Sequence, residues 1–255
     1  TGDSKIKVWT AGRAGTQNSL TAIVEQNELN DFGVILSGWG GVASAQSRDS
    51  KVQRQSLDDF EKQLEEVAVL RPSVTIGFGS QIEKSASQSP EADGQLNYSH
   101  AKIQARNLFL GMMERTGLVG KWIYIYSIYG RDMDASWLLP QLIRAGAQEI
   151  PLSMGPCAQK WGLLHISDFV RAIDTIVNSP TSFPAEVDLG GEATKTLREL
   201  VLEVEQILGQ HCATFDNEGL SSPDSVPNLA PLQAAGWTQR VTLMQGVQEL
   251  KDRYV

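Results

Sequence analysis

The segment Val74-Thr-Ile-Gly-Phe-Gly-Ser80 is an apolar run that ends in a serine. A polar loop follows it, and then comes Asn97-Tyr98-Ser99-His100-Ala101-Lys102. A short apolar run bounded by polar residues is typical of a buried strand. Apolar residues then recur with helical spacing at Ile103, Leu108, Phe109, Met112 and Met113. The order strand, loop, helix is the one in which a parallel α/β sheet presents its functional groups, so this segment predicts both the fold class and the place of a site.

Tyr98 and Lys102 are four residues apart, so both side chains leave the same face of the predicted helix. A lysine ammonium beside a phenol favours the phenolate, and we expect the pKa of Tyr98 to fall from about 10 toward a range useful for a general base. Ser80, at the end of the strand, can share a substrate hydroxyl with Tyr98. Together the three residues suit removal of a proton from an alcohol while a hydride leaves its carbon.

Strands and helices alternate along the rest of the chain. Strands are expected at residues 5–9, 33–36, 74–78, 121–126, 160–166 and 185–190. Helices are expected at residues 19–25, 57–70, 98–115, 137–145, 167–178, 197–208 and 242–254, with loops over 43–56 and 83–96. Thr196 is the expected N-cap of the helix over 197–208. This alternation predicts a mostly parallel sheet with helices on both faces.

Composition excludes several classes of function. A net charge of −8 without a Lys/Arg cluster argues against a nucleic-acid partner. No run approaches 18 apolar residues, so no membrane span is expected. Cys157 and Cys212 form no CxxC pair, which makes a reducing cytoplasm the expected location. The histidines show no spacing typical of metal ligands, and we expect no metal site.

The chain resembles the extended short-chain dehydrogenase/reductases, and within them the nucleotide-sugar epimerases, dehydratases and reductases. Three successive motifs carry the resemblance, namely Gly79-Ser80-Gln81, Tyr98-xxx-Lys102 and Tyr126-Ser-Ile-Tyr-Gly130. Residues 136–143, 159–173, 187–191 and 229–237 then resemble the later segments of that group in the same order. Ordered matches over roughly residues 30–255 are far more specific than any single motif.

The resemblance implies an α/β fold, a Rossmann-like mostly parallel sheet with a small C-terminal substrate lobe. Residues 1–130 with 160–192 would form the core, and residues 131–159 with 193–255 the substrate lobe. The implied activity is that of an NAD(P)-dependent nucleotide-sugar epimerase, dehydratase or 4-ketoreductase. The run Gly79-Ser-Gln-x-Glu83 resembles the corresponding segment of reductases that act on CDP-6-deoxy sugars. Family members pair the helices over 57–70 and 98–115 into a four-helix bundle, so a homodimer is expected.

The resemblance also implies roles for particular residues. Tyr98 would be the base, Lys102 its electrostatic partner and Ser80 the third catalytic group, and the first two would also hold the nicotinamide ribose. The implied cofactor contacts further include Ser37, Gly38, Gly12 and Gly15. The implied substrate contacts are Ser127, Gln81 and Trp161. By contrast, we expect Tyr124, Tyr126 and Tyr129 to serve packing, and Asp168 with Arg171 to form a solvated helix start.

The glycine-rich cofactor turn departs from its usual pattern. The segment Gly12-Arg-Ala-Gly15-Thr-Gln-Asn18 resembles GxxGxxG with Asn18 at the third glycine, where close packing normally excludes a side chain. Alternatively, residues 12–20 have the spacing of the family's third-strand exit, and the sheet would then lack its first strands. Either interpretation predicts weak binding of NAD or NADP by this chain. A non-catalytic sugar-nucleotide or partner-binding protein derived from the family therefore stands as an alternative function.

Overall fold

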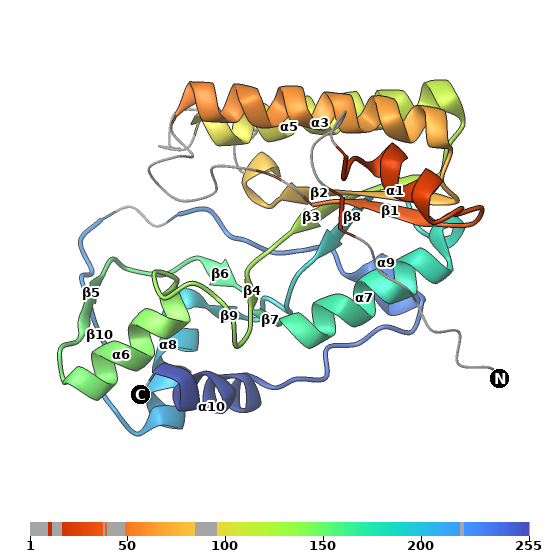
Figure 1. Ribbon diagram of the computed structural model, residues 1–255. Coiled ribbons are helices and arrows are strands. Elements are labelled where there is room, and N and C mark those ends of the chain that lie inside the picture. Colours follow the sequence, from red (N-terminus) through yellow and green to blue (C-terminus); the bar gives the residue numbers. More distant parts are fainter. Residues whose placement is uncertain are drawn as a thin grey trace. The chain divides into compact units, whose positions relative to one another are not determined.

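The computed structural model contains a mostly parallel sheet of strand order β1-β2-β3-β8 (Figure 1). The structure describes residues 10–11, 17–37, 39, 49–84, 96–219 and 222–254. The strands are β1 (Gly33–Leu36), β2 (Val74–Ser80), β3 (Gly120–Ile125) and β8 (Glu186–Leu189). Strands β1 and β2 are parallel, with Gly33 opposite Val74. The chain divides into two compact units, Thr1–Ile123 and Tyr124–Val255. The predicted Rossmann-like α/β fold is confirmed, whereas the finer assignment of residues 160–192 to the core stays a prediction.

Two long helices cover the strands of the first unit. They are α3 (Ser50–Leu70) and α5 (Leu96–Thr116), which lie side by side, and the short α1 (Leu20–Gln26) packs on α3 (Figure 1). The buried face of α3 carries Phe60, Leu64 and Val67, spaced by four and three residues. The loop expected over 43–56 is wrong for its last seven residues, because Asp49 caps α3 by accepting the N–H groups of Lys51 and Val52.

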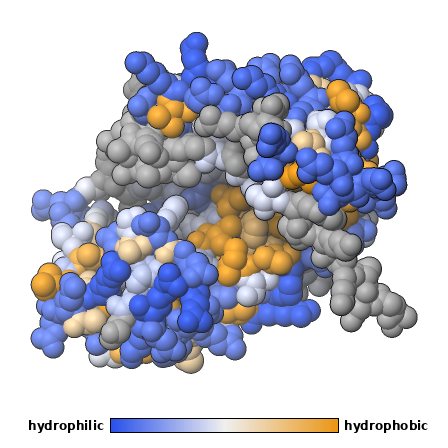
Figure 2. All heavy atoms as spheres, viewed as in Figure 1, coloured by the Kyte–Doolittle hydropathy of each residue, from blue (hydrophilic) through white to orange (hydrophobic). Residues whose placement is uncertain are grey.

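The exposed side of α3 is polar. Its exposed residues are Ser50, Lys51, Arg54, Gln55, Asp58, Glu61, Lys62, Glu65 and the single apolar Val69. Figure 2 likewise shows a mainly hydrophilic surface over this helix. The expected homodimer stays a prediction.

The second unit has its own apolar core between three helices. These are α6 (Leu138–Gln148), α8 (Leu197–Leu208) and α10 (Leu243–Tyr254), whose core residues include Leu142, Ile143, Val201, Val204, Val247 and Leu250. The parallel strands β5 (Leu152–Met154) and β10 (Ala213–Phe215) lie beside them. Thr196 and Glu199 form a capping box at the start of α8, which confirms the predicted N-cap.

The remaining elements of the second unit are short except for α7 (Ile166–Asn178). They are β4 (Ile128–Tyr129), β6 (Lys160–Trp161), β7 (Leu164–His165), η1 (Pro180–Ser182), β9 (Lys195–Thr196) and α9 (Ala230–Ala234). Strand β4 is parallel to β7, and β6 is antiparallel to β9. The single strand expected over 160–166 is therefore two short strands in two different sheets. The prediction that Tyr124, Tyr126 and Tyr129 serve packing is confirmed, because all three are buried.

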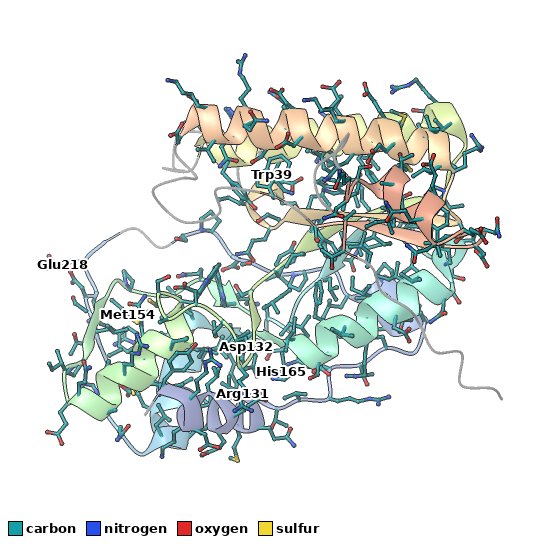
Figure 3. All side chains as sticks on the ribbon, in the orientation of Figure 1. Trp39, Arg131, Asp132, Met154, His165 and Glu218 are labelled. Carbon is teal, nitrogen blue, oxygen red and sulfur yellow. The ribbon has the colours of Figure 1, made fainter. Side chains whose placement is uncertain are left out.

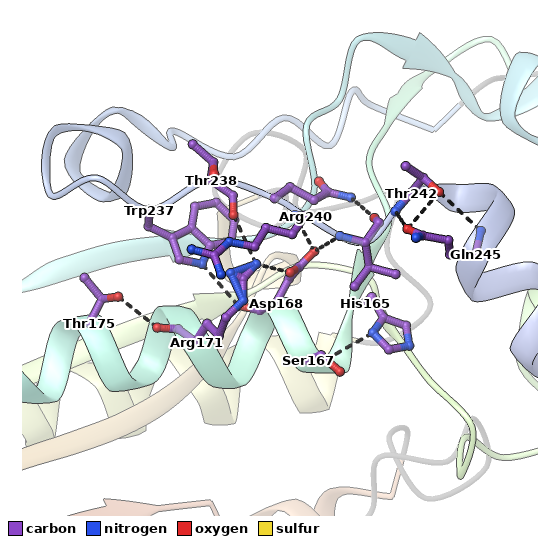
Figure 4. Close-up of polar contacts among 12 residues, drawn as sticks. His165, Ser167, Asp168, Arg171, Thr175, Trp237, Thr238, Arg240, Thr242 and Gln245 are labelled. Carbon is purple, nitrogen blue, oxygen red and sulfur yellow. Dashed lines mark hydrogen bonds and ion pairs between the residues drawn. The ribbon is translucent and has the colours of Figure 1, made fainter. Parts of the chain in front are cut away.

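Asp168 at the start of α7 is fully buried, so the expectation of a solvated helix start is wrong. Its Oδ2 accepts the backbone N–H groups of Arg240 and Val241 at 3.0 and 2.9 Å (Figure 4). The guanidinium of Arg171 pairs with its Oδ1, and the indole of Trp237 donates to its backbone carbonyl. One carboxylate thus fastens the segment before α10 onto α7. In the described part of the chain, no helix is long and apolar enough to cross a membrane.

Replacing Asp168 with Asn should destabilise the protein by about 3 kcal/mol, because an amide cannot accept two N–H groups and also pair with Arg171. Asp174→Asn is the matched control, since Asp174 is exposed on the same helix and should change stability by less than about 0.5 kcal/mol. Urea unfolding followed by circular dichroism measures both. Equal stability of the two variants would contradict the role given to Asp168.

Candidate functional site

The structure brings Ser80 and Tyr98 together at the exit of strand β2. Ser80 is the last residue of β2, and Tyr98 is the third residue of α5. Their side chains are hydrogen-bonded to each other. Lys102 follows one helical turn after Tyr98 and is only 4% exposed. All three residues lie in the first unit, and Gln81 follows Ser80 in the turn after the strand.

The ammonium of Lys102 is held by a backbone carbonyl and two aromatic rings. Its Nζ donates to the carbonyl oxygen of Phe78 at 2.5 Å. It also lies 4.2 Å from the ring centroid of Trp39 and 5.2 Å from that of Trp122, which are cation–π distances. Burial lowers the pKa of Lys102 to about 8, although the negative charge of Glu83 opposes the shift.

Trp39 covers this lysine from the side of the helices. Its Nε1 donates to Oε1 of Gln53 on α3 at 3.0 Å, and its ring packs on Phe60 with centroids 6.0 Å apart. Figure 3 shows Trp39 lying beneath α3. The residue therefore links α3 to Lys102 on α5. Ser37, expected to contact the cofactor, is exposed directly after β1.

Two glycines of β2 make room for the ring of Trp122. A Cβ atom on Gly77 would lie 2.6 Å from Cε3 of Trp122, and a Cβ on Gly79 would lie 2.3 Å from its Nε1. Real Cβ atoms essentially never lie this close to a non-bonded heavy atom. The alternating glycines of the opening sequence segment thus mark the close approach of an aromatic ring from β3, which the sequence analysis missed.

Glu83 is the second residue that sequence analysis missed. Its side chain is buried, with 1% of its surface exposed. Oε1 accepts the backbone N–H of Ser80 at 2.6 Å, and Oε2 accepts the indole N–H of Trp122 at 3.2 Å. Burial raises the pKa of Glu83, while the charges of Lys102 and Arg106 act in the opposite direction. A glutamate three residues after the motif serine was the signal available in the sequence.

The expected lowering of the pKa of Tyr98 by Lys102 is wrong for this structure. Burial is the largest influence and raises the pKa of Tyr98 to about 12. The hydrogen bond from Ser80 lowers it and the charge of Glu83 raises it further. The phenol therefore keeps its proton at neutral pH.

The other expected site residues are divided between the second unit and the undescribed positions. Ser127 and Trp161 lie in the second unit, where the carbonyl of Ser127 accepts the N–H of Leu164 and Trp161 is part of β6. Gly12, Gly15 and Gly38 lie outside the described residues. Among the residues that the structure describes, no group of three or more His, Cys, Asp or Glu side chains could hold a metal ion.

The described residues fit the ribose end of a nicotinamide cofactor, provided that the ribose can reach the ammonium of Lys102. A lysine ammonium has three N–H groups, and the bond to Phe78 uses one, so Lys102 retains donors for ribose hydroxyls. The ring of Trp39 lies 4.2 Å from that ammonium, which is only 4% exposed, so ribose hydroxyls need a change in this packing to reach it. Tyr98 and Ser80 supply the adjoining hydroxyl groups.

The fold of this chain is shared by solved structures that include nucleotide-sugar enzymes. The UDP-N-acetylglucosamine 4-epimerase of Methanobrevibacter ruminantium, solved with UDP-N-acetylmuramic acid, is 11% identical at a TM-score of 0.75 and covers 90% of this chain and 78% of its own. The dTDP-glucose 4,6-dehydratase of Bacillus anthracis, solved with NAD, is 18% identical at a TM-score of 0.71, with coverages of 92% and 75%. The protein RMD of Pseudomonas aeruginosa, solved with NADPH, is 15% identical at a TM-score of 0.69, with coverages of 87% and 80%.

The comparisons by sequence give no further identification. No family profile matches the chain, and no curated protein matches it. The expected resemblance is therefore confirmed by the fold, at sequence identities too low to transfer any activity.

The stability of the protein should depend on pH through Lys102. The pKa of this lysine is about 8 in the folded protein and 10.5 when exposed, so between these values the unfolded chain binds more protons and folding becomes more favourable as pH rises. Relative to a Lys102→Met variant, the wild type should gain about 3 kcal/mol of stability between pH 7 and 10.5.

Urea unfolding at several pH values measures this gain. Lys62→Met, at an exposed position of α3, is the matched control and should differ from the wild type by the same amount at every pH. A wild-type stability that stays parallel to that of Lys102→Met would contradict the burial of a titrating ammonium.

Proposed function

We propose that this protein is a cytoplasmic NAD(P)-dependent nucleotide-sugar enzyme of the epimerase, dehydratase or 4-ketoreductase type. The observation that carries the proposal is the hydrogen-bonded pair of Ser80 and Tyr98, one helical turn from the buried ammonium of Lys102. A strand exit facing a helix is the usual place for chemistry in a parallel sheet. The solved relatives of this fold carry NAD, NADPH or nucleotide sugars.

In the proposed reaction Tyr98 exchanges a proton with the oxygen that lies on the reacting carbon of the sugar. Ser80 shares that oxygen through its hydroxyl and fixes its orientation. The ammonium of Lys102 steadies the ribose hydroxyls of the cofactor. A bound nicotinamide supplies or accepts the hydride. Ser127, Gln81 and Trp161 are proposed contacts of the nucleotide sugar, and a homodimer through α3 and α5 belongs to the same proposal.

A second function is a non-catalytic protein that binds a sugar nucleotide or a partner. The position of Trp39 favours it, because a ring 4.2 Å from the ammonium of Lys102 stands where a cofactor ribose needs access. The hydrogen-bonded Ser80 and Tyr98 have no evident use in such a protein and favour the enzyme. Cofactor binding separates the two functions.

Tyr98→Phe should abolish turnover, because it removes the proton-transferring oxygen and leaves no large cavity. The assay follows oxidation of NADPH with a panel of nucleotide 4-keto-6-deoxy sugars. We expect a loss in kcat of at least about 100-fold, with folding and nucleotide-sugar binding close to those of the wild type. Tyr254→Phe, in the second unit, is the control and should stay active. Retention of more than about a tenth of the activity in Tyr98→Phe would remove Tyr98 from the mechanism.

The chain should bind free NAD(P)⁺ and NAD(P)H only at millimolar concentrations or more weakly. Each charge-assisted hydrogen bond to a pyrophosphate contributes about 1.5–3 kcal/mol, and the segment with Gly12, Gly15 and Asn18 departs from the usual turn. Losing two such bonds weakens binding by about two to four powers of ten. Titration calorimetry with NADH and NADPH measures the affinity. Micromolar binding would show a working pyrophosphate turn, whereas no binding beside tight nucleotide-sugar binding would favour the non-catalytic function.

A further inference from the structure

We propose that Trp39 competes with the cofactor for Lys102, so that a nicotinamide ribose binds the ammonium only by displacing the indole ring. This inference rests on the proposed function and adds a regulation of the same site. It makes Trp39 a residue that lowers the affinity for the cofactor, and it makes Gln53, which holds the indole, part of the same device.

The three residues of the proposed site differ in their access to solvent. Ser80 and Tyr98 are partly exposed, whereas only 4% of Lys102 is exposed. A ribose held by Lys102 must bring a hydroxyl oxygen to hydrogen-bond distance of the ammonium, about 2.7–3.2 Å. One of the neighbours of the ammonium therefore has to move before the ribose can bind.

The neighbours of the ammonium differ in how firmly they are held. The carbonyl of Phe78 belongs to the backbone of β2, inside the sheet. The ring of Trp122, from β3, is fully buried and lies against the backbone of β2 at Gly77. Trp39, by contrast, follows β1 outside any helix or strand, and its side chain is partly exposed. Among these three groups Trp39 is therefore the one that can move without breaking the sheet or its core.

Specific contacts hold the ring of Trp39 beside the ammonium. The ring centroid lies 4.2 Å from Nζ of Lys102, within the range of a cation–π interaction. The indole N–H donates to Oε1 of Gln53 at 3.0 Å, and Gln53 is a fixed partner because only 2% of it is exposed. The ring also packs on Phe60 of α3. Helix α3 therefore anchors the indole in the position that it takes beside Lys102.

An aromatic ring and a ribose hydroxyl compete for the same ammonium. Moving the ring away from Lys102 forfeits the cation–π contact and the hydrogen bond to Gln53, and the contacts of the ribose must offset both losses. The apparent affinity for the cofactor is then reduced by the fraction of molecules in which the ring has already moved. One cation–π contact and one net hydrogen bond of ordinary strength make this reduction about tenfold or more.

The first test is the affinity of Trp39→Ala for NADH, measured by titration calorimetry on the full chain. We expect this variant to bind NADH at least about tenfold more tightly than the wild type. Trp137→Ala is the matched control, because it removes an exposed indole from the second unit, and it should bind as the wild type does. Equal binding by Trp39→Ala overturns the proposal. Weaker binding also overturns it, because the ring would then contribute to the affinity.

A second variant releases the ring without removing it. Gln53→Met keeps the length of the side chain but removes the carboxamide oxygen, so Trp39 loses its hydrogen bond. This variant should bind NADH more tightly than the wild type and less tightly than Trp39→Ala. Circular dichroism checks the folding of both variants, and Gln53→Met decides the question if Trp39→Ala does not fold. An affinity of Gln53→Met equal to that of the wild type, or below it, overturns the proposal.

Chemical labelling of Lys102 needs no cofactor and supplies an independent readout. Acetic anhydride acetylates amines that reach solvent, and peptide mass spectrometry compares Lys102 with the exposed Lys62 of α3 in the same sample. Lys102 should be protected in the wild type and acetylated several times faster in Trp39→Ala. An unchanged rate in Trp39→Ala overturns the proposal. If neither the wild type nor any variant binds NADH, the proposed function fails, while acetylation still decides whether Trp39 blocks access to Lys102.

Discussion

The indole of Trp122 is the side chain on which the first unit depends. It lies against the backbone of β2 at Gly77 and Gly79, donates its N–H to Glu83, and turns a face toward the ammonium of Lys102 at 5.2 Å. A glycine inside a strand costs about 0.5–1 kcal/mol relative to alanine, so two in one buried strand need a compensating contact. The close approach of this ring is that contact. The positions of both buried charges follow from it.

Burying those charges is expensive, and the structure compensates for each one locally. Lys102 receives a carbonyl and two ring faces, and Glu83 receives two N–H donors. A buried pair of opposite charges is nevertheless often no more stabilising than apolar residues of similar volume. Stability alone therefore does not explain why this unit buries both an ammonium and a carboxylate. The chemistry proposed for Ser80 and Tyr98 would account for it.

The elements that could be predicted are those whose signals are local. Strand β2, helix α5 and the cap of α8 at Thr196 follow from runs, spacing and capping residues within about twenty positions. The start of α3 was missed because its cap, Asp49, stands in a polar stretch without apolar periodicity. Asp168 was misjudged for a different reason: its burial depends on N–H groups at positions 240 and 241, more than seventy residues away. Local sequence carries no information about such a partner.

The site shows the same limit in its electrostatics. Helical spacing predicts that Tyr98 and Lys102 share a face of the helix. It does not predict which neighbouring groups shift the pKa of Tyr98. The ammonium turns to Phe78 and Trp39, and burial is the largest influence on the pKa of Tyr98, with Ser80 lowering it and Glu83 raising it. These influences come from four separate segments of the chain. The pKa of this tyrosine is therefore set by the residues packed around the Tyr-xxx-Lys pair, and the spacing of the pair alone does not predict its direction of shift.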